Sequence, residues 1–208
     1  MKKILLIFLL LNTYSSKVFS QLPQYKNLIQ LIDSLYNVDQ KTMTDIVEGS
    51  QKNVSPEKMK ELFGKQNETI KRHIPIEKYI IEKYGYPTIN KVGKESSHHF
   101  FTLVQHADAD VNFQEKILKY IKKEVAQKHV TGTDFAFLSD RVRLAKGQSQ
   151  LYGSQVNYDD AGNAASKNLY KPKTVDKRRQ KFGLEPLNNY LKMMTEVHKS
   201  MNPGKYPN

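Results

Sequence analysis

Apolar residues recur at helical spacing from the start of the mature chain. Leu28, Leu31, Ile32 and Leu35 fall on one face of a helix that is expected to run from about residue 24 to beyond Asp39. Asp39 and its neighbour Gln40 are polar residues at the far end of this helix, and the pattern gives them no explanation.

A second helical region is marked by its ends. Ser55 before Pro56 is typical of a helix start, because serine caps free amides and proline fits the first turn. Pro75 is expected to break or kink the helix, since it lacks an amide donor and clashes with the preceding turn. The helix that follows is predicted to end at Gly85, and residues 85–97 are predicted to form a turn-rich connector.

Three more helices are predicted in the middle of the chain. The first starts at Ser97 and ends near Ala107, the second follows Asp108 or Asp110, and the third covers residues 134–146. The third helix carries so little polar surface that it is expected to be buried.

The chain then becomes polar, with the alternation typical of strands. Residues 150–158 and 166–173 are predicted to form a two-stranded ribbon, which must pack on the helices because an isolated ribbon is marginal. Helices are expected again at 174–182 and 186–200, and residues 201–208 are expected to fray.

The pattern as a whole predicts a mainly α fold: a single helical domain at residues 21–200 with a small two-stranded β-ribbon packed on it. About 188 residues are enough to bury roughly 70% of the unfolded surface in one core. The chain has no cysteine, so neither disulfides nor a thiolate site supports that core.

Residues 1–20 have the pattern of an export signal. Lys2 and Lys3 precede the apolar run Ile4–Leu11, and Ser20 supplies a small residue at the expected cleavage point. The run is shorter than the roughly 20 residues that a membrane-spanning helix needs. We therefore expect export to the periplasm or the medium, with no transmembrane anchor after signal removal.

Positive charge is concentrated near the C-terminus. Removing the three lysines of the signal leaves 30 basic and 21 acidic residues, and residues 167–208 hold ten basic and three acidic ones. Such a segment is either a solvated face or a docking face for an anionic envelope polymer. No specific nucleic acid partner is expected, because no aromatic-interleaved motif accompanies the charge. The cations of interest are Lys173, Lys177, Arg178 and Arg179.

Three polar motifs lie in otherwise apolar surroundings between residues 98 and 155. They are Gln105-His106-Ala107-Asp108, Asp140-Arg141 and the segment Gln148–Gln155. Burying such groups costs several kcal/mol unless they find partners. We expect the motifs to meet at one water-accessible hollow that takes a small polar or anionic ligand, with ligand-binding residues Gln105, Arg141, Gln148, Gln150, Tyr152 and Gln155.

His106 is the candidate for proton transfer, because a free histidine titrates near neutral pH. We predict His106 and Asp108 as the catalytic residues, with Asp108 orienting the imidazole. Asp110, four residues beyond His106, is the other possible orienter but is predicted to have a structural role. The alternative is that His106 donates to a helix-end carbonyl while Asp108 or Asp110 caps the next helix.

Asp140 and Arg141 cannot pair with each other, because neighbours on a helix point about 100° apart. Asp140 is predicted to be structural, whereas Arg141 either joins an internal ion pair or grips a carboxylate or phosphate. The amides of Gln148, Gln150 and Gln155 suit recognition of sugar hydroxyls or amides. The alternative is a polar strand face wetted by solvent.

No metal and no cofactor is predicted. The chain lacks an HExxH motif, a glycine-rich phosphate loop and a Gly-x-Ser-x-Gly elbow, although ligand types gather between His98 and Asp110. Ordinary surface positions are expected for the other histidines, His73, His129 and His198.

Taken together, the motifs resemble a family of bacterial domains of unknown function that are often exported. That family carries a Gly-aromatic-Pro turn, a Val-Gly step, Gln-His-Ala-Asp, Asp-Arg and Gln-x-Tyr-Gly-Thr-Gln. Two departures, Tyr86 for tryptophan and Ser154 for threonine, keep the chemistry similar. The resemblance covers most of the mature chain and implies no established activity. The matching segments are Gly85-Tyr86-Pro87, Val92-Gly93, Gln105–Asp108, Asp140-Arg141 and Gln150–Gln155.

Two functions follow as hypotheses. The first is a polar ligand-binding or hydrolytic site with His106 as acid or base, Asp108 as its orienter, and Arg141 with Gln155 holding the ligand. The alternative is a non-catalytic envelope interaction protein that uses the basic C-terminal face. The residues alone leave open whether the protein is an enzyme.

Overall fold

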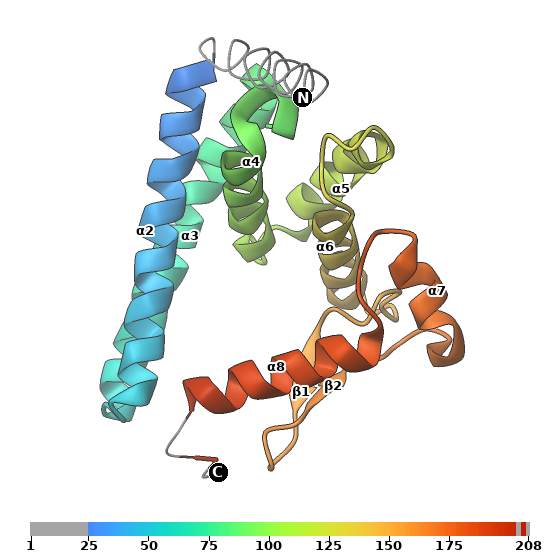
Figure 1. Cartoon of the computed structure of the whole chain (residues 1–208). Helices are drawn as coiled ribbons and strands as arrows, with labels where there is room; N and C mark the ends of the chain where they lie inside the picture. The colour runs from blue at the N-terminus through green and yellow to red at the C-terminus, as the bar shows by residue number, and fades with distance from the viewer. Residues whose placement is uncertain (1–24, 203–204, 207–208) are drawn as a thin grey trace, which may run out of the picture.

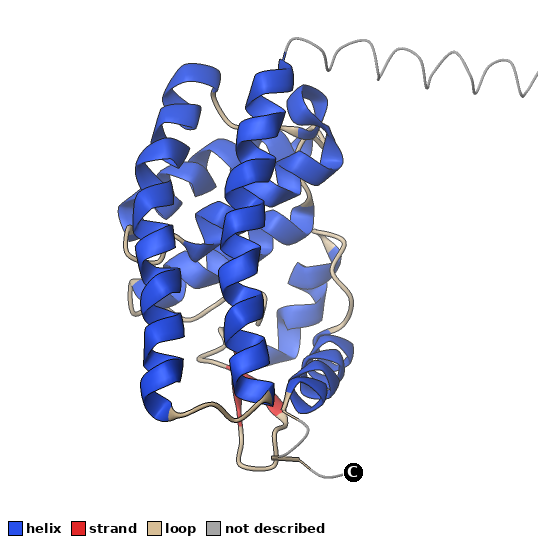
Figure 2. Cartoon of the chain, turned by 90° about the vertical axis from the view of Figure 1, so that its left-hand side faces the viewer, coloured by secondary structure: helices blue, strands red, loops and turns tan. Residues whose placement is uncertain are grey.

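The structure is a computed structural model that describes residues 25–202, 205 and 206. The expected export signal lies outside these residues. Helices α2 (Lys26–Gln51) and α3 (Pro56–Tyr84) form a long antiparallel hairpin, and both views show them side by side (Figures 1 and 2). Ser55 caps α3 by accepting a hydrogen bond from the Lys58 amide at 3.2 Å, which confirms the predicted helix start.

Two expectations about this region are wrong. Helix α3 continues through Pro75, so the proline does not break the helix. Pro75 lies on the exposed side of the helix, where the carbonyl that loses its donor can be hydrated. The expected connector at 85–97 is mostly helical, because α4 (Ile89–His106) begins soon after Gly85 and only Gly93, at φ 83°, departs from helical geometry.

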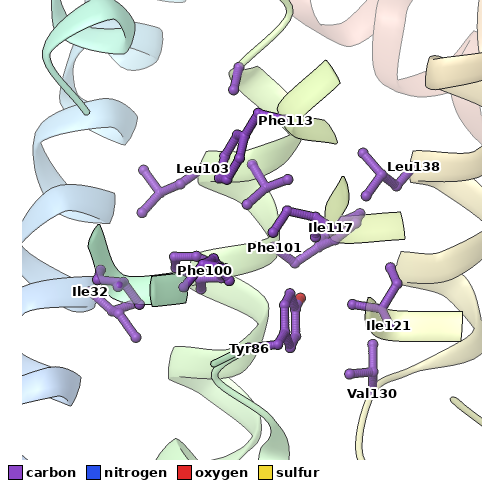
Figure 3. Close-up of a cluster of buried hydrophobic side chains, with 14 of the residues drawn as sticks. Ile32, Tyr86, Phe100, Phe101, Leu103, Phe113, Ile117, Ile121, Val130 and Leu138 are labelled. Atoms are coloured by element: carbon purple, nitrogen blue, oxygen red, sulfur yellow. The ribbon is translucent and has the colours of Figure 1, made fainter. Parts of the chain in front are cut away.

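The core lies between the hairpin and the pair α5 (Val111–Ala126) and α6 (Gly132–Ala145). Helix α4 contributes large apolar side chains that meet those of α5, as Figure 3 shows. Helix α6 contributes its buried face from the far side, in line with the prediction that this helix is buried. The most enclosed contributions are Phe100, Leu103, Ile117, Ile121 and Leu138.

The C-terminal part folds around α6. Strands β1 (Val156–Tyr158) and β2 (Ala164–Ser166) pair antiparallel, and the ribbon packs on α8 (Leu187–Met201) through a 2.8 Å bond from the Ala164 amide to Thr195 Oγ1. The strands are shorter than predicted, because residues 150–155 wrap around a buried carboxylate of α6 instead of extending. A 3-10 turn at 172–174 and α7 (Val175–Gln180) link the ribbon to α8.

A close backbone approach joins this part to α6. A Cβ atom at Gly132 would overlap the carbonyl oxygen of Phe182, so only glycine fits there. Near the chain end, Met201 is the last residue of α8, and the Tyr206 hydroxyl lies 3.2 Å from His198 Nε2.

The predicted fold class is confirmed: the described residues are mainly helical, with one two-stranded antiparallel sheet. Among these residues, no helix has both the length and the apolar character required to cross a bilayer.

Candidate functional site

His106, the last residue of α4, faces a buried carboxylate on α2. Its Nδ1 lies 2.9 Å from both Oδ1 and Oδ2 of Asp39, and Gln40 Nε2 donates to Oδ2 at 2.9 Å. The Asp39 side chain is 1% exposed and that of His106 is 19% exposed. Because a carboxylate only accepts hydrogen bonds, Nδ1 carries the hydrogen and Nε2 is the nitrogen left to accept a proton.

His106 lines a hollow of about 550 Å³ at the end of α4. Its size falls within the range of small-ligand pockets, roughly 300–1,000 Å³. Helix α3 supplies two amides and a lysine, the α4–α5 loop supplies a carboxylate and α6 supplies a guanidinium. No serine, threonine, tyrosine or cysteine is among the lining residues, which are Met43, Gln66, Asn67, Ile70, Lys71, His106, Asp108, Ala109 and Arg141.

Asp108 and Arg141 are paired at the rim of the hollow. Arg141 Nη1 donates to Asp108 Oδ2 at 2.5 Å, and Gln114 Nε2 donates to Oδ1 at 3.1 Å. The same Gln114 nitrogen donates to the carbonyl of Gln105, so the amide ties the end of α4 to the start of α5. Asp108, expected to orient His106, therefore has other partners, and Asp39 holds the imidazole in its place.

Two further titratable residues, His73 and Glu77 of α3, are buried within electrostatic reach of Asp39. Burial raises the pKa of Glu77 to about 8; the charge of Asp39 adds to this effect and Lys78 opposes it. Burial lowers the pKa of His73, with Asp39 opposing. His73 Nδ1 and Glu77 Oε2 have no hydrogen-bond partner among the described residues. Burial therefore favours the neutral form of both side chains.

Asp140 occupies a different face of α6 and does not line the hollow. Its carboxylate accepts from the amides of Leu151, Tyr152 and Ser154 at 2.6–3.2 Å, and from Ser154 Oγ at 3.0 Å. Burial raises its pKa against the opposing effect of these hydrogen bonds. Gly153, at φ 74°, lets the loop curl around the carboxylate.

The glutamines of the third motif lie away from the hollow. The fully buried side chain of Gln150 donates to the carbonyls of Gln155 and Lys167 and accepts from the Gln155 amide at 3.0 Å. Gln155 donates to Ser154 Oγ at 3.3 Å, and Gln148 is exposed after α6.

The expectation that all three motifs converge is thus wrong: only the first two meet at the hollow. The reason is the angle between neighbours on α6, which directs Asp140 toward the loop and Arg141 toward the hollow. Tyr152 is buried in the loop, and its carbonyl accepts from Arg179 Nη1 at 2.6 Å. Asp110 caps α5 through the Phe113 amide and pairs with Lys78 at 2.6 Å.

The basic C-terminal face is smaller than the charge count suggests. Arg179 is 1% exposed, and its Nε donates to the carbonyl of Glu185 at 2.6 Å. Arg178 Nε donates to the carbonyl of Leu151 at 2.7 Å. Two of the four cations considered for docking therefore hold the fold together, while Lys173 and Lys177 remain exposed.

Sequence reasoning missed three residues of this site: Asp39, His73 and Glu77. The prediction that His73 lies at the surface is wrong, because it is 6% exposed. The signal that could have identified Asp39 and Glu77 as buried is the helical spacing of the apolar residues around them. Asp39 continues the buried stripe four residues after Leu35, and Glu77 precedes the buried Ile80 by three.

Within residues 25–202, 205 and 206, no group of three or more His, Cys, Asp or Glu side chains is arranged to hold a metal ion.

Comparison with known proteins gives a family but no activity. The model of a family described as "Family of unknown function (DUF6624)" matches residues 26–200. No curated protein and no solved structure matches the chain.

Proposed function

The chain belongs to this family of unknown function, and we propose that it carries an acid–base site for a small polar ligand, with His106 as the proton-transferring group. The supporting observation is that a buried Asp39 holds Nδ1 of His106, and that His106 is one of the residues that line a ligand-sized hollow. A carboxylate placed in this way fixes the tautomer of the ring and stabilises the imidazolium that forms when Nε2 accepts a proton. Export, expected from residues 1–20, is part of the proposal.

The reaction that suits this lining is hydrolysis by water. The lining offers neither hydroxyl nor thiol nucleophiles, so no residue of this lining could form an acyl-enzyme through serine or cysteine. In the proposed step, His106 Nε2 takes a proton from a water molecule whose oxygen attacks the electrophilic centre of the ligand. The imidazolium then returns that proton to the leaving group, which restores the resting state.

Arg141 and the amides of α3 are proposed to position the ligand. Arg141 uses one nitrogen on Asp108, and its fork suits a carboxylate or phosphate oxygen that displaces this partner. Gln66 and Asn67 offer donors and acceptors to hydroxyl or amide groups of the ligand.

The test compares two histidines of α4 that each pair with an aspartate of α2. His99 Nδ1 lies 2.8 Å from Asp33 Oδ1, just as His106 pairs with Asp39, but His99 is stacked on Tyr36 at 3.8 Å and is not part of the hollow. His99→Ala is therefore the matched control for His106→Ala.

The probes are p-nitrophenyl acetate, p-nitrophenyl phosphate and p-nitrophenyl N-acetylglucosaminide for turnover, and acetate, inorganic phosphate and N-acetylglucosamine for binding. We expect one of the three binding probes, a carboxylate, a phosphate or a sugar, to shift the ring resonances of His106. Turnover of the p-nitrophenyl compound of the same class should fall at least about 100-fold in His106→Ala. The same turnover should persist in His99→Ala. Equal turnover in both variants, or no probe that reaches His106, would refute the proposal.

A further inference from the structure

Arg141 differs from the other arginines of the chain in how its guanidinium is bonded. In each of the others, Nε donates to a main-chain carbonyl; these are Arg72, Arg143, Arg178 and Arg179. In Arg141, Nε is buried and has no hydrogen-bond partner among the described residues, and Nη1 donates to Asp108. A guanidinium carries five N–H donors in a planar fork, so Arg141 has binding capacity that the fold does not use.

Asp108 does not give both its oxygens to this fork. Arg141 Nη1 binds Oδ2 at 2.5 Å, whereas Oδ1 accepts from Gln114 Nε2 at 3.1 Å. A carboxylate or phosphate that enters the hollow from solvent has at least two oxygens free for the guanidinium, and bidentate pairing is stronger than a single bond. A ligand oxyanion therefore has an advantage over Asp108 as the partner of Arg141.

Asp108 can leave Arg141 at low cost. Its side chain is 59% exposed, so water hydrates the carboxylate once it is released, and exposed ion pairs contribute little to stability. The buried Gln114 Nε2 keeps the carbonyls of Val104 and Gln105 as acceptors, at 3.1 and 3.2 Å. Replacement of Asp108 by a ligand therefore leaves no acceptor or donor of Gln114 Nε2 unmet.

The charged side chains that line the hollow also favour an anion. They are Lys71, Arg141 and Asp108, so two cations remain when Asp108 turns to solvent. Lys71 pairs with Glu68 at 2.9 Å, but the two side chains are 63% and 64% exposed, and water screens such a pair. Asp39 opposes the attraction, but its charge is buried and bound to Nδ1 of His106.

We propose that the ligand of this site carries a carboxylate or phosphate group, and that Asp108 is the residue that determines this specificity. In the free protein, the carboxylate of Asp108 occupies the position on Arg141 that the oxyanion of the ligand takes on binding. The inference rests on the proposed function, because it concerns the ligand of the same hollow. A neutral sugar offers no charge to replace that of Asp108, so it is rejected.

The experiment measures binding at Arg141 without any turnover. The side-chain Nε–Hε resonances of arginine are recorded for the isotopically labelled chain during titration with acetate, inorganic phosphate or N-acetylglucosamine at constant ionic strength. The variants are Asp108→Asn, Asp108→Ala and Arg141→Lys. Glu115→Gln is the matched control, because Glu115 of α5 pairs with Lys146 of α6 at 2.8 Å but does not line the hollow.

We expect acetate or phosphate to shift the Nε–Hε resonance of Arg141, which is identified by its loss in Arg141→Lys. N-acetylglucosamine should leave this resonance unchanged. Asp108→Asn and Asp108→Ala should bind the same anion roughly 5-fold more tightly than the wild type, because the competing carboxylate is gone. Glu115→Gln, which loses the same charge without releasing Arg141, should bind like the wild type. The anion that binds then shows whether the ligand group is a carboxylate or a phosphate.

Two results would overturn the proposal. A shift of the Arg141 resonance by N-acetylglucosamine, or by none of the probes, would refute the anionic ligand, and the wild type alone decides this point. An anion that binds the Asp108 variants no more tightly than the wild type, or that gains as much in Glu115→Gln, would show that Asp108 does not compete for Arg141.

This inference and the proposed function can fail separately. If an anion binds at Arg141 and more tightly in Asp108→Asn, but His106→Ala leaves turnover unchanged, the anion site stands and the hydrolytic function falls. If turnover depends on His106 with the N-acetylglucosaminide alone, the function stands and the anionic ligand is refuted.

Discussion

Asp39 and Asp140 are both fully buried carboxylates, but their surroundings differ. Asp140 accepts hydrogen bonds from three backbone amides and one hydroxyl, all within residues 151–154. Asp39 accepts from two side chains, His106 and Gln40, and stands beside the buried titratable residues of α3. The first carboxylate is enclosed by a loop, and the second lies behind an imidazole that borders an open hollow.

The difference separates a carboxylate that supports a loop from one that lies beside the proposed site. Five buried side-chain polar atoms have no partner among the described residues, and four of them are on residues that line the hollow, bond to a lining residue or feel the charge of Asp39. Unmet hydrogen bonds cost free energy, so each of these groups lowers stability and calls for an explanation, which the proposed site offers. The four are on His73, Glu77, Gln114 and Arg141.

The largest expected effect is the loss of Asp140. Asp140→Ala leaves the amides of Leu151, Tyr152 and Ser154 buried without acceptors, at about 1–3 kcal/mol each, so the free energy of unfolding should fall by about 5 kcal/mol. Urea denaturation followed by circular dichroism measures it. Asp140→Asn keeps one acceptor oxygen and should lose less. A fall of under about 1 kcal/mol in the alanine variant would show that the loop does not depend on this carboxylate.

The next effect depends on pH and comes from Glu77. Its folded pKa of about 8 exceeds the ordinary 4.5, so between these values the folded protein holds a proton that the unfolded chain has lost. Stability therefore falls as pH rises through this window, by roughly 4 kcal/mol at pH 8. Glu77→Gln has no such group and should be more stable than the wild type by about that amount at pH 8, and by under about 1 kcal/mol at pH 5.

Denaturation of both proteins at several pH values checks this second prediction. Glu82→Gln, at an exposed position of α3, should follow the wild type throughout. If the difference in unfolding free energy between Glu77→Gln and the wild type did not change with pH, Glu77 would be ionised in the folded protein. The region around Asp39 would then hold no neutral buried acid, and it would differ less from the region around Asp140.

Most of the helices are predictable from the sequence, because their apolar periods and caps are local. Ser55 and Gly85 mark the ends of α3 as expected. Pro75 is not predictable in this way, since the cost of a proline depends on whether the freed carbonyl faces water. The short length of the ribbon also has a non-local cause. The path of residues 151–154 is determined by the carboxylate of Asp140, which lies eleven or more positions earlier in the sequence.

The candidate site is only half predictable for a related reason. His106, Asp108 and Arg141 are recognised as polar groups in apolar segments, and they do meet. Asp39, which orients His106, is 67 residues away from it in the sequence, and no local pattern links the two. Gln150 and Gln155 are residue types that suit ligand binding, but their amide groups form hydrogen bonds within the loop that contains them.

A smaller effect on stability is expected for His106. His106→Ala removes the main partner of Asp39, but it also opens the hollow so that water reaches the carboxylate, which limits the loss to about 2 kcal/mol. The same denaturation assay measures it, with His99→Ala as the comparison. A loss of unfolding free energy as large as that of Asp140→Ala would show that His106 mainly stabilises the core, and would contradict its role as a site residue.

The smallest effect tests whether the two regions are independent. The Tyr190 hydroxyl donates to the carbonyl of Ser154 at 2.8 Å and so supports the loop around Asp140 from α8. Tyr190→Phe should cost about 1 kcal/mol, the usual net value of one hydrogen bond. Tyr79→Phe removes an exposed hydroxyl of α3 and should cost almost nothing.

Because the loop and the hollow lie on different faces of α6, the ring resonances of His106 should be unchanged in Tyr190→Phe. A shift of those resonances would show that the loop and the site respond as one unit, and Asp39 and Asp140 would then belong to a single network.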